Sequence, residues 1–348
     1  MIITRTPFRV SFFGGGTDYP VWYREHGGAV LGAGIDKYCY ITCRHLPPFF
    51  DHHSRIIYSQ VENVARNEEI QHPSVRACLK HLGIEEGVEI HHDADLPART
   101  GLGSSSAFTV GLLNALYGLR GKLCDRHSLA TEAIHVEQEL LQENVGAQDQ
   151  VLAAYGGFHR VRFQPHGAIE ATPIMVSSHR LRHLEQQLLL YFTGFSRFAS
   201  EIARHQIQNT PQRQAELMEM MAMVEEATGI VTDERRSLEE FGRLLDRTWQ
   251  LKRRLTDKIS TAYIDELYAR GLAAGALGGK LLGAGGGGFL LFFVPQECQP
   301  GFREAMRDLL WVPFRFSPTG AQVVYYEPGE PYAQDLARQR AKIYAQHG

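Results

Sequence analysis

A glycine- and serine-rich segment, LPARTGLGSSSA at residues 96–107, constrains the fold of this chain more than any other feature. A strand-like run at 88–92 precedes it and an apolar helical run at 108–116 follows it. Such a turn is a typical anion site, because its backbone amides and the helix dipole face the bound charge. The alternative is a serine-capped helix after a tight turn. The expected phosphate-binding residues are Gly101, Leu102, Gly103, Ser104, Ser105 and Ser106.

The composition limits the partners of this site. With 348 residues, of which 44% are hydrophobic and 22% charged, the chain suits a globular protein of one large or two ordinary domains. A formal net charge of −3 predicts no general attraction to nucleic acid or anionic membranes. The chain contains no apolar run of about 18 residues, which is the length that a helix needs to span a bilayer. We therefore expect small-molecule partners, without nucleic acid or membrane, and local recognition of phosphate.

The cysteines and the first residues predict a compartment. Five cysteines are scattered at positions 39, 43, 78, 124 and 298 without a C-x-x-C pair. This pattern indicates reduced thiols in a cytoplasmic protein. The opening MIITRTP does not resemble a signal peptide. The 16 histidines form no H-E-x-x-H motif, so no zinc site is expected.

The order of sequence patterns predicts an α+β (mixed α/β) chain of two lobes, residues 1–175 and 176–348. The first half alternates strand-like and helical runs, and the second half adds long amphipathic helices from about 211 and 237. We expect Asp36–Lys37 to form a hairpin turn between two β-rich runs. We also expect one helix over 125–143 that breaks at 144–147.

A second glycine cluster, GGGTDYP at 14–20, follows a strand-like run at 9–13. It places a hydroxyl, a carboxylate and a phenol after a glycine turn. A carboxylate accepts two hydroxyl hydrogen bonds at once, so Asp18 suits a polyol. The alternative is an ordinary aspartate turn after a strand. The expected substrate-binding residues here are Gly15, Gly16, Thr17, Asp18 and Tyr19.

A third cluster, KLLGAGGGGFL at 280–290, formally contains the G-x-G-x-x-G pattern of dinucleotide-binding proteins. That pattern requires a strand before it and a helix after it, whereas we expect helical sequence before this cluster and a strand at 289–294. A P-loop is excluded because Gly279–Lys280 is followed by leucine. We expect glycines such as Gly286 and Gly287 to let the backbone approach a substrate or the first glycine loop. The alternative is a flexible connector.

Two acidic residues have no obvious partner in the sequence. Glu137 lies in the expected helix at 125–143, and Asp149 follows the helix break. Taken alone, Glu137 suits a solvated helix position and Asp149 suits a helix N-cap.

Together, the three glycine clusters resemble the motifs of the GHMP kinases, the superfamily of galactokinase, homoserine kinase, mevalonate kinase and phosphomevalonate kinase. Thr6–Tyr19 is similar to the first motif of that family, Leu96–Ala107 to the second and Leu282–Phe289 to the third, in family order. The resemblance implies an N-terminal ribosomal protein S5 domain 2-like lobe and a C-terminal ferredoxin-like lobe. It also implies that ATP and an acceptor bind in the cleft between them.

The same resemblance implies roles for single residues. The backbone at 101–106 would cradle the triphosphate of ATP, and Ser105 and Glu137 would hold Mg²⁺. Asp149 matches the aspartate that orients or deprotonates the acceptor hydroxyl in the sugar-kinase members. Arg9 matches the arginine that faces this aspartate. The resemblance therefore implies that Asp149 and Arg9 are the catalytic residues.

The first motif departs from galactokinase, which carries Gly-Glu-His-Thr-Asp-Tyr where this chain has GGGTDY. The form GGGTDYP looks like that of the D-glycero-D-manno-heptose 7-phosphate kinases, as do GSSSAF at 103–108, VGAQDQ at 145–150 and YFTGFSR at 191–197. This resemblance implies that ATP phosphorylates the anomeric hydroxyl of heptose 7-phosphate to the 1,7-bisphosphate. Such a reaction lies on the route to GDP-heptose and surface polysaccharide.

Three alternatives stay open at this point. They are a kinase of an unphosphorylated sugar such as fucose, a small-alcohol kinase of the mevalonate branch, and a non-catalytic ligand-binding member of the fold. A 7-phosphate needs a cation, and we expect Arg197 to supply it, ahead of Arg162 and Arg99. A salt bridge between the lobes is the other use of Arg197. A homodimer is an open alternative for the assembly.

Overall fold

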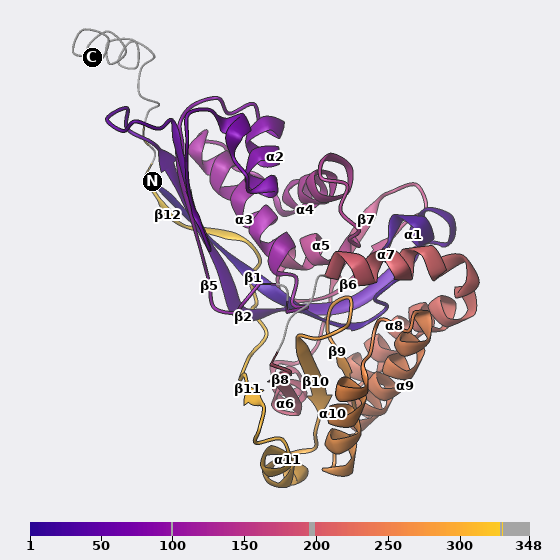
Figure 1. Ribbon diagram of the computed structural model, residues 1–348. Helices are drawn as coiled ribbons and strands as arrows, with labels where there is room; N and C mark the ends of the chain where they lie inside the picture. Colours follow the sequence, from indigo (N-terminus) through magenta and orange to yellow (C-terminus); the bar gives the residue numbers. More distant parts are fainter. Residues whose placement is uncertain (99, 195–198, 328, 330–348) are drawn as a thin grey trace, which may run out of the picture.

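Two sheets organise the computed structural model, which describes residues 1–98, 100–194, 199–327 and 329 (Figure 1). The larger sheet has the order β12-β1-β2-β5-β3-β4, with β6 paired to β2 and β7 to β6. Its strands are β1 (Ile2–Phe13), β2 (Gly28–His45), β3 (Ser54–Ile57), β4 (Val61–Val64), β5 (Val88–Ala94), β6 (Phe158–Phe163), β7 (Ile169–Pro173) and β12 (Gln322–Tyr326). The smaller sheet has the order β11-β8-β10-β9, formed by β8 (Leu188–Phe192), β9 (Gly278–Leu281), β10 (Phe289–Phe293) and β11 (Leu310–Trp311).

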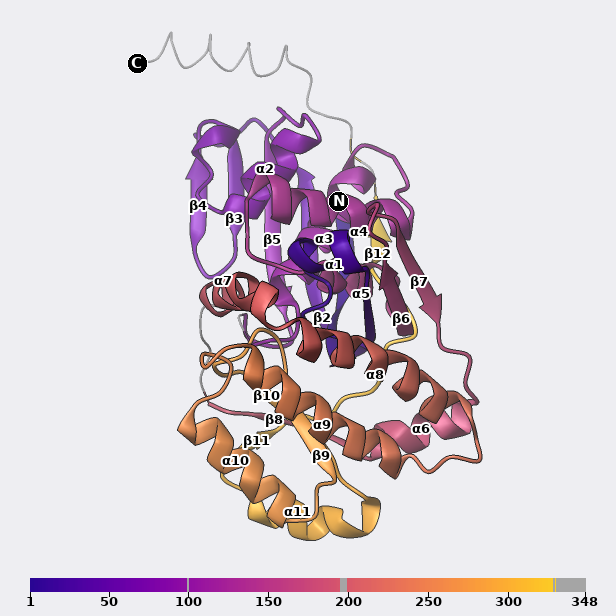
Figure 2. The ribbon, with the colours of Figure 1, turned by 90° about the vertical axis from the view of Figure 1, so that its right-hand side faces the viewer.

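A group of helices covers one face of the larger sheet (Figures 1 and 2). The helices are α2 (Pro73–His81), α3 (Ser104–Leu119), α4 (Arg126–His135) and α5 (Gln148–Tyr155). The central helix α3 packs on β1 and β2 and is flanked by α2, α4 and α5. Its apolar sequence is nearly all buried for that reason. The short α1 (Pro20–His26) follows the loop after β1.

The remaining helices accompany the smaller sheet. They are α6 (Ser178–Gln186), α7 (Ala199–Asn209), α8 (Gln214–Thr232), α9 (Glu239–Leu255), α10 (Ala262–Ala273) and α11 (Gln299–Ala305). Figure 2 shows α7 and α8 where the two halves meet, and α8 contacts both β1 and β2. The ring of Phe241 on α9 lies 5.5 Å from that of Phe12 and 5.0 Å from that of Phe13, both on β1. Within the described ranges, no helix has the length and apolar character needed to cross a bilayer.

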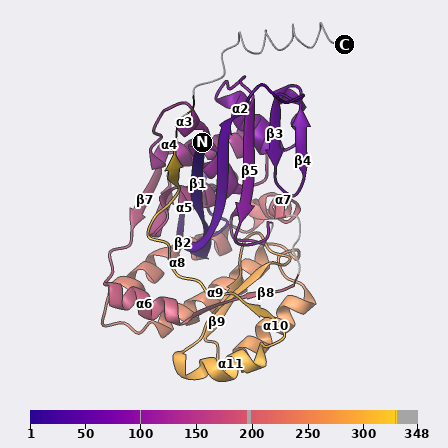
Figure 3. The ribbon, with the colours of Figure 1, turned by 90° about the vertical axis from the view of Figure 1, so that its left-hand side faces the viewer.

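The last described strand returns to the larger sheet. The expected boundary near residue 175 falls between β7 and α6, yet β12 pairs antiparallel with the start of β1 (Figure 3). On the way back, Phe316 forms a β-bridge with Ile35. The two halves of the chain are therefore tied together at their ends as well as through their cores.

The expected hairpin turn at Asp36–Lys37 is wrong, because β2 runs unbroken through these residues. The returning segment explains the difference. The N–H of Asp36 donates to the carbonyl of Arg315, and the N–H of Arg315 donates to the Asp36 carboxylate, each over 2.9 Å. A turn-forming dipeptide thus obtains in an extended strand the hydrogen bonds that it would otherwise make in a turn.

Two further expectations need correction. The helix expected over 125–143 ends as α4 at His135, and a π-helical turn (Val136–Leu140) continues it. The third glycine cluster is preceded by the strand β9 rather than by helical sequence, so it forms the loop of the antiparallel β9–β10 hairpin. A dinucleotide site remains excluded, because a strand rather than a helix follows the glycines.

Candidate active site

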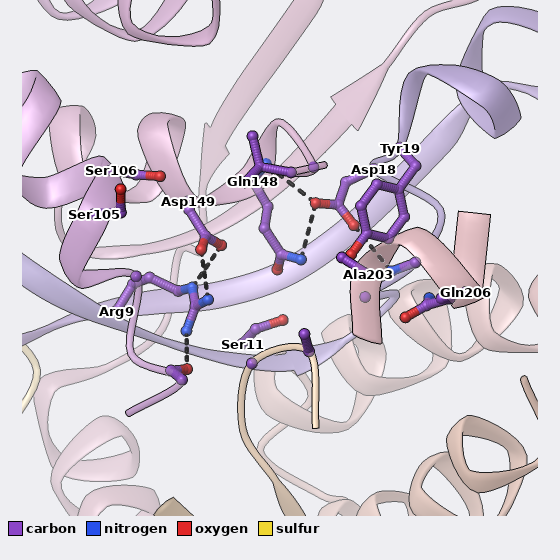
Figure 4. A pocket seen from close by; sticks show the side chains of 18 of the residues that line it. Arg9, Ser11, Asp18, Tyr19, Ser105, Ser106, Gln148, Asp149, Ala203 and Gln206 are labelled. Atoms are coloured by element: carbon purple, nitrogen blue, oxygen red, sulfur yellow. Dashed lines mark hydrogen bonds and ion pairs between the residues drawn. The ribbon is translucent and has the colours of Figure 1, made fainter. Parts of the chain in front are cut away.

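A pocket opens where the larger sheet meets the second half of the chain, and most of the expected site residues line it (Figure 4). Strand β1, the loop after it, and the segments that begin α3 and α5 contribute to the first half of the wall. Helices α7 and α9, strand β9 and the β9–β10 loop contribute to the second. The expected residues in the lining are Arg9, Gly15, Gly16, Asp18, Tyr19, Gly101, Gly103, Ser104, Ser105, Ser106 and Asp149.

Arg9 and Asp149 form a two-pronged ion pair in this pocket (Figure 4). Nε and Nη2 of Arg9 donate to Oδ1 and Oδ2 of Asp149 over 2.7 and 2.6 Å, and Nη1 donates to the carbonyl of Gly101 over 2.6 Å. Asp149 lies in the first turn of α5, where the helix dipole favours a carboxylate. The Arg9 side chain is 4% exposed and that of Asp149 is 25% exposed. The carboxylate is therefore fixed in direction but still open to a ligand.

The start of α3 forms a cradle for an anion. Gly101 and Gly103 have positive φ angles of 86° and 73°, a region that favours glycine, and Gly103 is the N-cap of the helix. The first-turn amides have no acceptor within the helix, and the dipole adds positive charge there. A Cβ on Gly103 would lie 3.1 Å from Cγ of Arg9 and 3.4 Å from Oδ2 of Asp149. The cradle therefore adjoins the ion pair.

Glu137 is fully buried on the π-helical turn behind the cradle. Its Oε2 accepts hydrogen bonds from Oγ of Ser106 over 2.8 Å and from Nε2 of Gln150, while Oε1 has no hydrogen-bond partner among the described residues. Burial raises the pKa of this carboxyl to about 7, against the opposing effect of the Thr109 and Ser106 hydroxyls. The structure thus pairs Glu137 with Ser106, whereas the expected partner Ser105 is exposed.

The unpartnered oxygen of Glu137 is of the kind that binds magnesium, although Glu137 lies behind the pocket lining rather than in it. Mg²⁺ is usually bound through one or two carboxylates, with substrate phosphates and waters as the other ligands. It therefore needs no protein cage, and no group of three or more His, Cys, Asp or Glu side chains gathers in the described part of the chain. We propose that Glu137, with the hydroxyl of Ser105 or Ser106, would hold the ion beside phosphates in the cradle.

Asp18 and Thr17 hold the loop after β1 in place. Oδ1 of Asp18 accepts the N–H of Gly16 over 2.9 Å, and Oδ2 accepts the side-chain amide of Gln148 over 3.0 Å. Burial raises the pKa of Asp18, and the charge of Asp149 adds to this effect. Asp18 lines the pocket, but its carboxylate already accepts hydrogen bonds from Gly16 and Gln148. Thr17 is fully buried, its hydroxyl bonds to backbone atoms, and it does not line the pocket.

The third glycine cluster packs directly against the first glycine loop. A Cβ on Gly283 would lie 2.4 Å from Cα of Gly101, and a Cβ on Gly288 would lie 2.2 Å from the carbonyl oxygen of Thr100. Of the two purposes expected for these glycines, the structure shows the approach to the first loop. Only backbone can fit at this contact between the two halves.

Three expected residues contribute less than the sequence suggests. The hairpin lines the pocket with Gly283 and Ala284 rather than with Gly286 and Gly287. Leu102 has a fully buried side chain, and its carbonyl accepts the N–H of Arg9 over 3.0 Å.

The expected cations for a sugar phosphate are not in the described pocket. Arg162 pairs with Glu225 over 2.9 Å at the surface and lines a different, shallow depression. Arg197 and Arg99 lie outside the described residues.

Two lysines that the sequence analysis did not single out line the pocket, Lys252 on α9 and Lys280 on β9. They are 5% and 2% exposed. Nζ of Lys252 donates to the carbonyls of Leu281 and Gly283 over 3.0 and 2.5 Å, and Nζ of Lys280 donates to the carbonyl of Phe12 over 2.9 Å. Burial lowers the pKa of Lys252 to about 7 and that of Lys280 well below its usual value.

Each lysine leaves a signal in the sequence. Lys252 falls on the apolar stripe of α9, in helical register with Leu245, Thr248 and Leu255, which are all buried. Lys280 interrupts a glycine and leucine run that forms a fully buried strand. Because lysine is almost never fully buried unless it is paired, a lysine within an apolar pattern marks a site worth testing.

Two family models match the chain. The model described as the GHMP kinases N terminal domain matches residues 70–157, and the model described as GHMP kinases C terminal matches residues 223–309. The first range contains the cradle, Glu137 and Asp149. The second contains Lys252, Lys280 and the glycine hairpin.

Relatives among characterised proteins include sugar kinases. The chain is 28% identical over 318 residues to the D-glycero-alpha-D-manno-heptose 7-phosphate kinase of Campylobacter jejuni, covering 88% of this chain and 93% of that protein. It is 27% identical to the L-fucokinase/L-fucose-1-P guanylyltransferase of Bacteroides fragilis, over 86% of this chain but 35% of that protein.

A solved structure shares the fold. The D-glycero-D-manno-heptose 1-phosphate kinase from Bacteroides thetaiotaomicron superposes with a TM-score of 0.71 at 22% identity, covering 94% of this chain and 100% of that one. At this level of sequence identity, the similarity supports a shared fold and nothing more specific.

Proposed function

Because this chain belongs to the GHMP kinase superfamily and is a sugar kinase with an alcohol group as acceptor, we propose that its acceptor is D-glycero-D-manno-heptose 7-phosphate. The γ-phosphoryl group of ATP moves to the anomeric hydroxyl, giving ADP and the 1,7-bisphosphate. The product would serve the route to GDP-heptose and surface polysaccharide. The heptose kinase relative supports this acceptor, since the similarity extends over most of both chains.

The observation that carries the proposal is the position of the Asp149 carboxylate beside the cradle. Arg9 orients both carboxylate oxygens, and a Cβ added at Gly103, the N-cap of α3 in the cradle, would lie 3.4 Å from Oδ2 of Asp149. A hydroxyl at Asp149 would therefore lie next to a phosphate bound at the start of α3. This is the placement that in-line phosphoryl transfer needs, because the reaction depends mainly on positioning and charge stabilisation.

The proposed reaction is a direct phosphoryl transfer that uses residues of this pocket. The anomeric oxygen bonds to the γ-phosphorus as the bond to the ADP oxygen breaks, and the hydroxyl proton passes to Asp149. An anomeric hydroxyl is more acidic than an ordinary alcohol, so an oriented carboxylate suffices as base. The amides at 101–106 stabilise the charge on the phosphates. When bound at Glu137, Mg²⁺ supplies further neutralisation of phosphate oxygens.

The loop after β1 would receive the sugar. A Cβ on Gly15 would have no neighbour closer than 3.7 Å, so the glycine leaves open space where a side chain could stand. Asp18 and Tyr19, labelled in Figure 4, line the same pocket as Gly15. We assign them to the sugar hydroxyls, which Asp18 would bind with the accepting capacity that Gly16 and Gln148 leave free.

The test is a comparison of acceptors with ATP and Mg²⁺. The kcat/KM values are measured by ADP release for heptose 7-phosphate, free heptose, fucose and mevalonate, and the product is identified by phosphorus NMR. We expect the highest kcat/KM with heptose 7-phosphate and an anomeric phosphate in the product. A higher value with fucose or mevalonate would reject the proposed acceptor.

A second candidate is a fucose kinase. The observation in its favour is the fucokinase relative, which matches most of this chain. The same acceptor series distinguishes it, because a fucose kinase requires no phosphate on its acceptor.

A further inference from the structure

Lys252 and Lys280 bring two ammonium groups into the pocket without carboxylate partners. In the described ranges their hydrogen bonds go to three backbone carbonyls, and neither lysine takes part in an ion pair. The nearby acids are already engaged, Asp149 by Arg9 and Asp18 by backbone and amide donors. Burial of a charge without a counter-charge is strongly unfavourable. A bound anion would therefore stabilise the two ammonium groups.

The lysines also keep unused donors. An ammonium group has three N–H donors. Lys252 uses two of them and Lys280 uses one on the carbonyls described above. Both residues line the pocket, so the remaining donors can serve a ligand there.

Lys280 contacts β1 further along the strand than the Arg9–Asp149 ion pair. Arg9 holds Asp149 at one point of the strand, and Lys280 bonds to the carbonyl of Phe12, three residues further along. An extended strand advances about 10 Å over three residues. The strand then leads into the glycine loop that carries Asp18. Lys280 thus lies toward the sugar end of the pocket, at a span suited to a sugar that carries a charge at its far end. Lys252 interacts electrostatically with Lys280 and also bonds to Gly283, which packs against Gly101.

We propose that Lys252 and Lys280 bind a phosphate monoester already present on the acceptor sugar, at the end remote from the reacting hydroxyl. This inference rests on the proposed function and gives its preference for a phosphorylated acceptor a physical cause. A phosphate dianion takes up the free N–H donors and provides the missing counter-charge. An unphosphorylated sugar provides no such counter-charge, so burial continues to disfavour the charged form of both lysines. The depressed lysine pKa values are consistent with this need.

The kinetic test compares Lys280→Met with the matched control Lys258→Met, since Lys258 is exposed and outside the pocket. For heptose 7-phosphate, the Lys280 variant is expected to lose about 100-fold in kcat/KM, as for a lost charged hydrogen bond. For free heptose the loss is expected to stay within about threefold, with an unchanged KM for ATP. The control keeps the wild-type values for both acceptors.

Two results would overturn the inference. Equal losses on the two acceptors would assign Lys280 a general structural role, and a raised KM for ATP would assign it to the nucleotide phosphates. Thermal unfolding checks the structural role separately. Because methionine removes a buried charge, we expect the unliganded variant to keep or raise its Tm. Lys252→Met is measured in the same way.

A binding experiment separates this inference from the proposed function. Wild type is saturated with Mg²⁺ and a non-hydrolysable ATP analogue, and inorganic phosphate is then titrated while Tm is followed. Phosphate should raise the Tm of wild type and Lys258→Met but not of Lys280→Met. No rise in wild type overturns the lysine site even if heptose kinase activity is found. A rise without kinase activity on any sugar phosphate supports the site and rejects the proposed function alone.

Discussion

Asp149 is the single residue whose chemistry can be tested most sharply, because Arg9 already fixes its direction. We expect Asp149→Asn to lower kcat by about 100-fold or more, since an amide keeps the shape but accepts no proton. The measurement is ADP release at saturating ATP and sugar phosphate. Asp308→Asn is the control, because Asp308 is an exposed carboxylate paired with Arg270. A near-wild-type rate in Asp149→Asn would remove the aspartate from the proton-transfer step.

Glu137 can be tested through the metal requirement. Glu137→Gln keeps an acceptor for Ser106 and Gln150 but removes the charge beside the cradle. We expect the Mg²⁺ concentration for half-maximal rate to rise about tenfold or more. Glu139→Gln, on the same π-helical turn but exposed and near Arg24, is the matched control. An unchanged Mg²⁺ dependence would place the ion elsewhere.

Lys252 predicts a pH dependence of stability. Its folded-state pKa of about 7 lies below the ordinary value of 10.5, mainly through burial, with Arg9 adding to the effect and Asp18 and Asp149 opposing it. Between these values the unfolded chain binds the extra proton, so wild-type stability gains from this group as pH rises. The Tm of Lys252→Met relative to wild type should be highest at or below pH 7 and fall toward pH 10.

Thermal unfolding of both proteins across this pH range checks the prediction. Lys280, Arg9, Asp18 and Asp149 face Lys252 in both proteins, so their titration largely cancels in the difference. A Tm difference that does not change with pH would show that Lys252 is charged in the folded protein.

At single positions, the sequence predicted what depends on local motifs and missed what depends on the fold. Gly101, Gly103 and Asp149 were placed from glycine patterns and their resemblance to a family, and they meet in one pocket. Lys252 and Lys280 stand far apart from Arg9 in the chain. Only the packing of α9 and β9 on β1 brings their ammonium groups into the same space.

Among the elements, the contact between the two glycine loops controls the shape of the cradle. Gly283→Ala would place a Cβ 2.4 Å from Cα of Gly101, at a φ of 73°. We expect a loss of about 1–3 kcal/mol in unfolding free energy and a raised KM for ATP, because the first loop must move. Denaturant unfolding and ADP release measure the two effects.

Gly301→Ala provides the control for that substitution. Gly301 lies in α11 with open space around it, so alanine should be neutral or stabilising there. An unchanged stability and KM in Gly283→Ala would show that the two loops can separate without consequence for ATP binding.

Some of the helices and strands were predicted from local sequence patterns, and others depend on contacts that such patterns do not reveal. Apolar periodicity indicated the helical runs that became α3, α8 and α9. The turn expected at Asp36–Lys37 failed because its hydrogen-bond partners come from Arg315, which no local pattern reveals. The π-helical turn that holds Glu137 was missed because its residues continue an ordinary helical pattern.

For the whole molecule, we expect one cooperative unfolding transition. Among the residues that the structure describes, the buried apolar side chains form one cluster that includes β1 and α9, and β12 pairs with the edge of the larger sheet from late in the chain. Calorimetry should therefore show one peak whose Tm rises when nucleotide and sugar phosphate bind. Two separate peaks would mean that the halves unfold independently.

The pairing of β12 with the start of β1 has a consequence for biosynthesis. The first strand leaves the ribosome early, but the strand that covers its outer edge arrives some 300 residues later. Until then the backbone groups at Ile2–Arg5 stay open and can template pairing with other nascent chains. Shielding of this edge by a chaperone during translation would therefore favour a good yield of native enzyme.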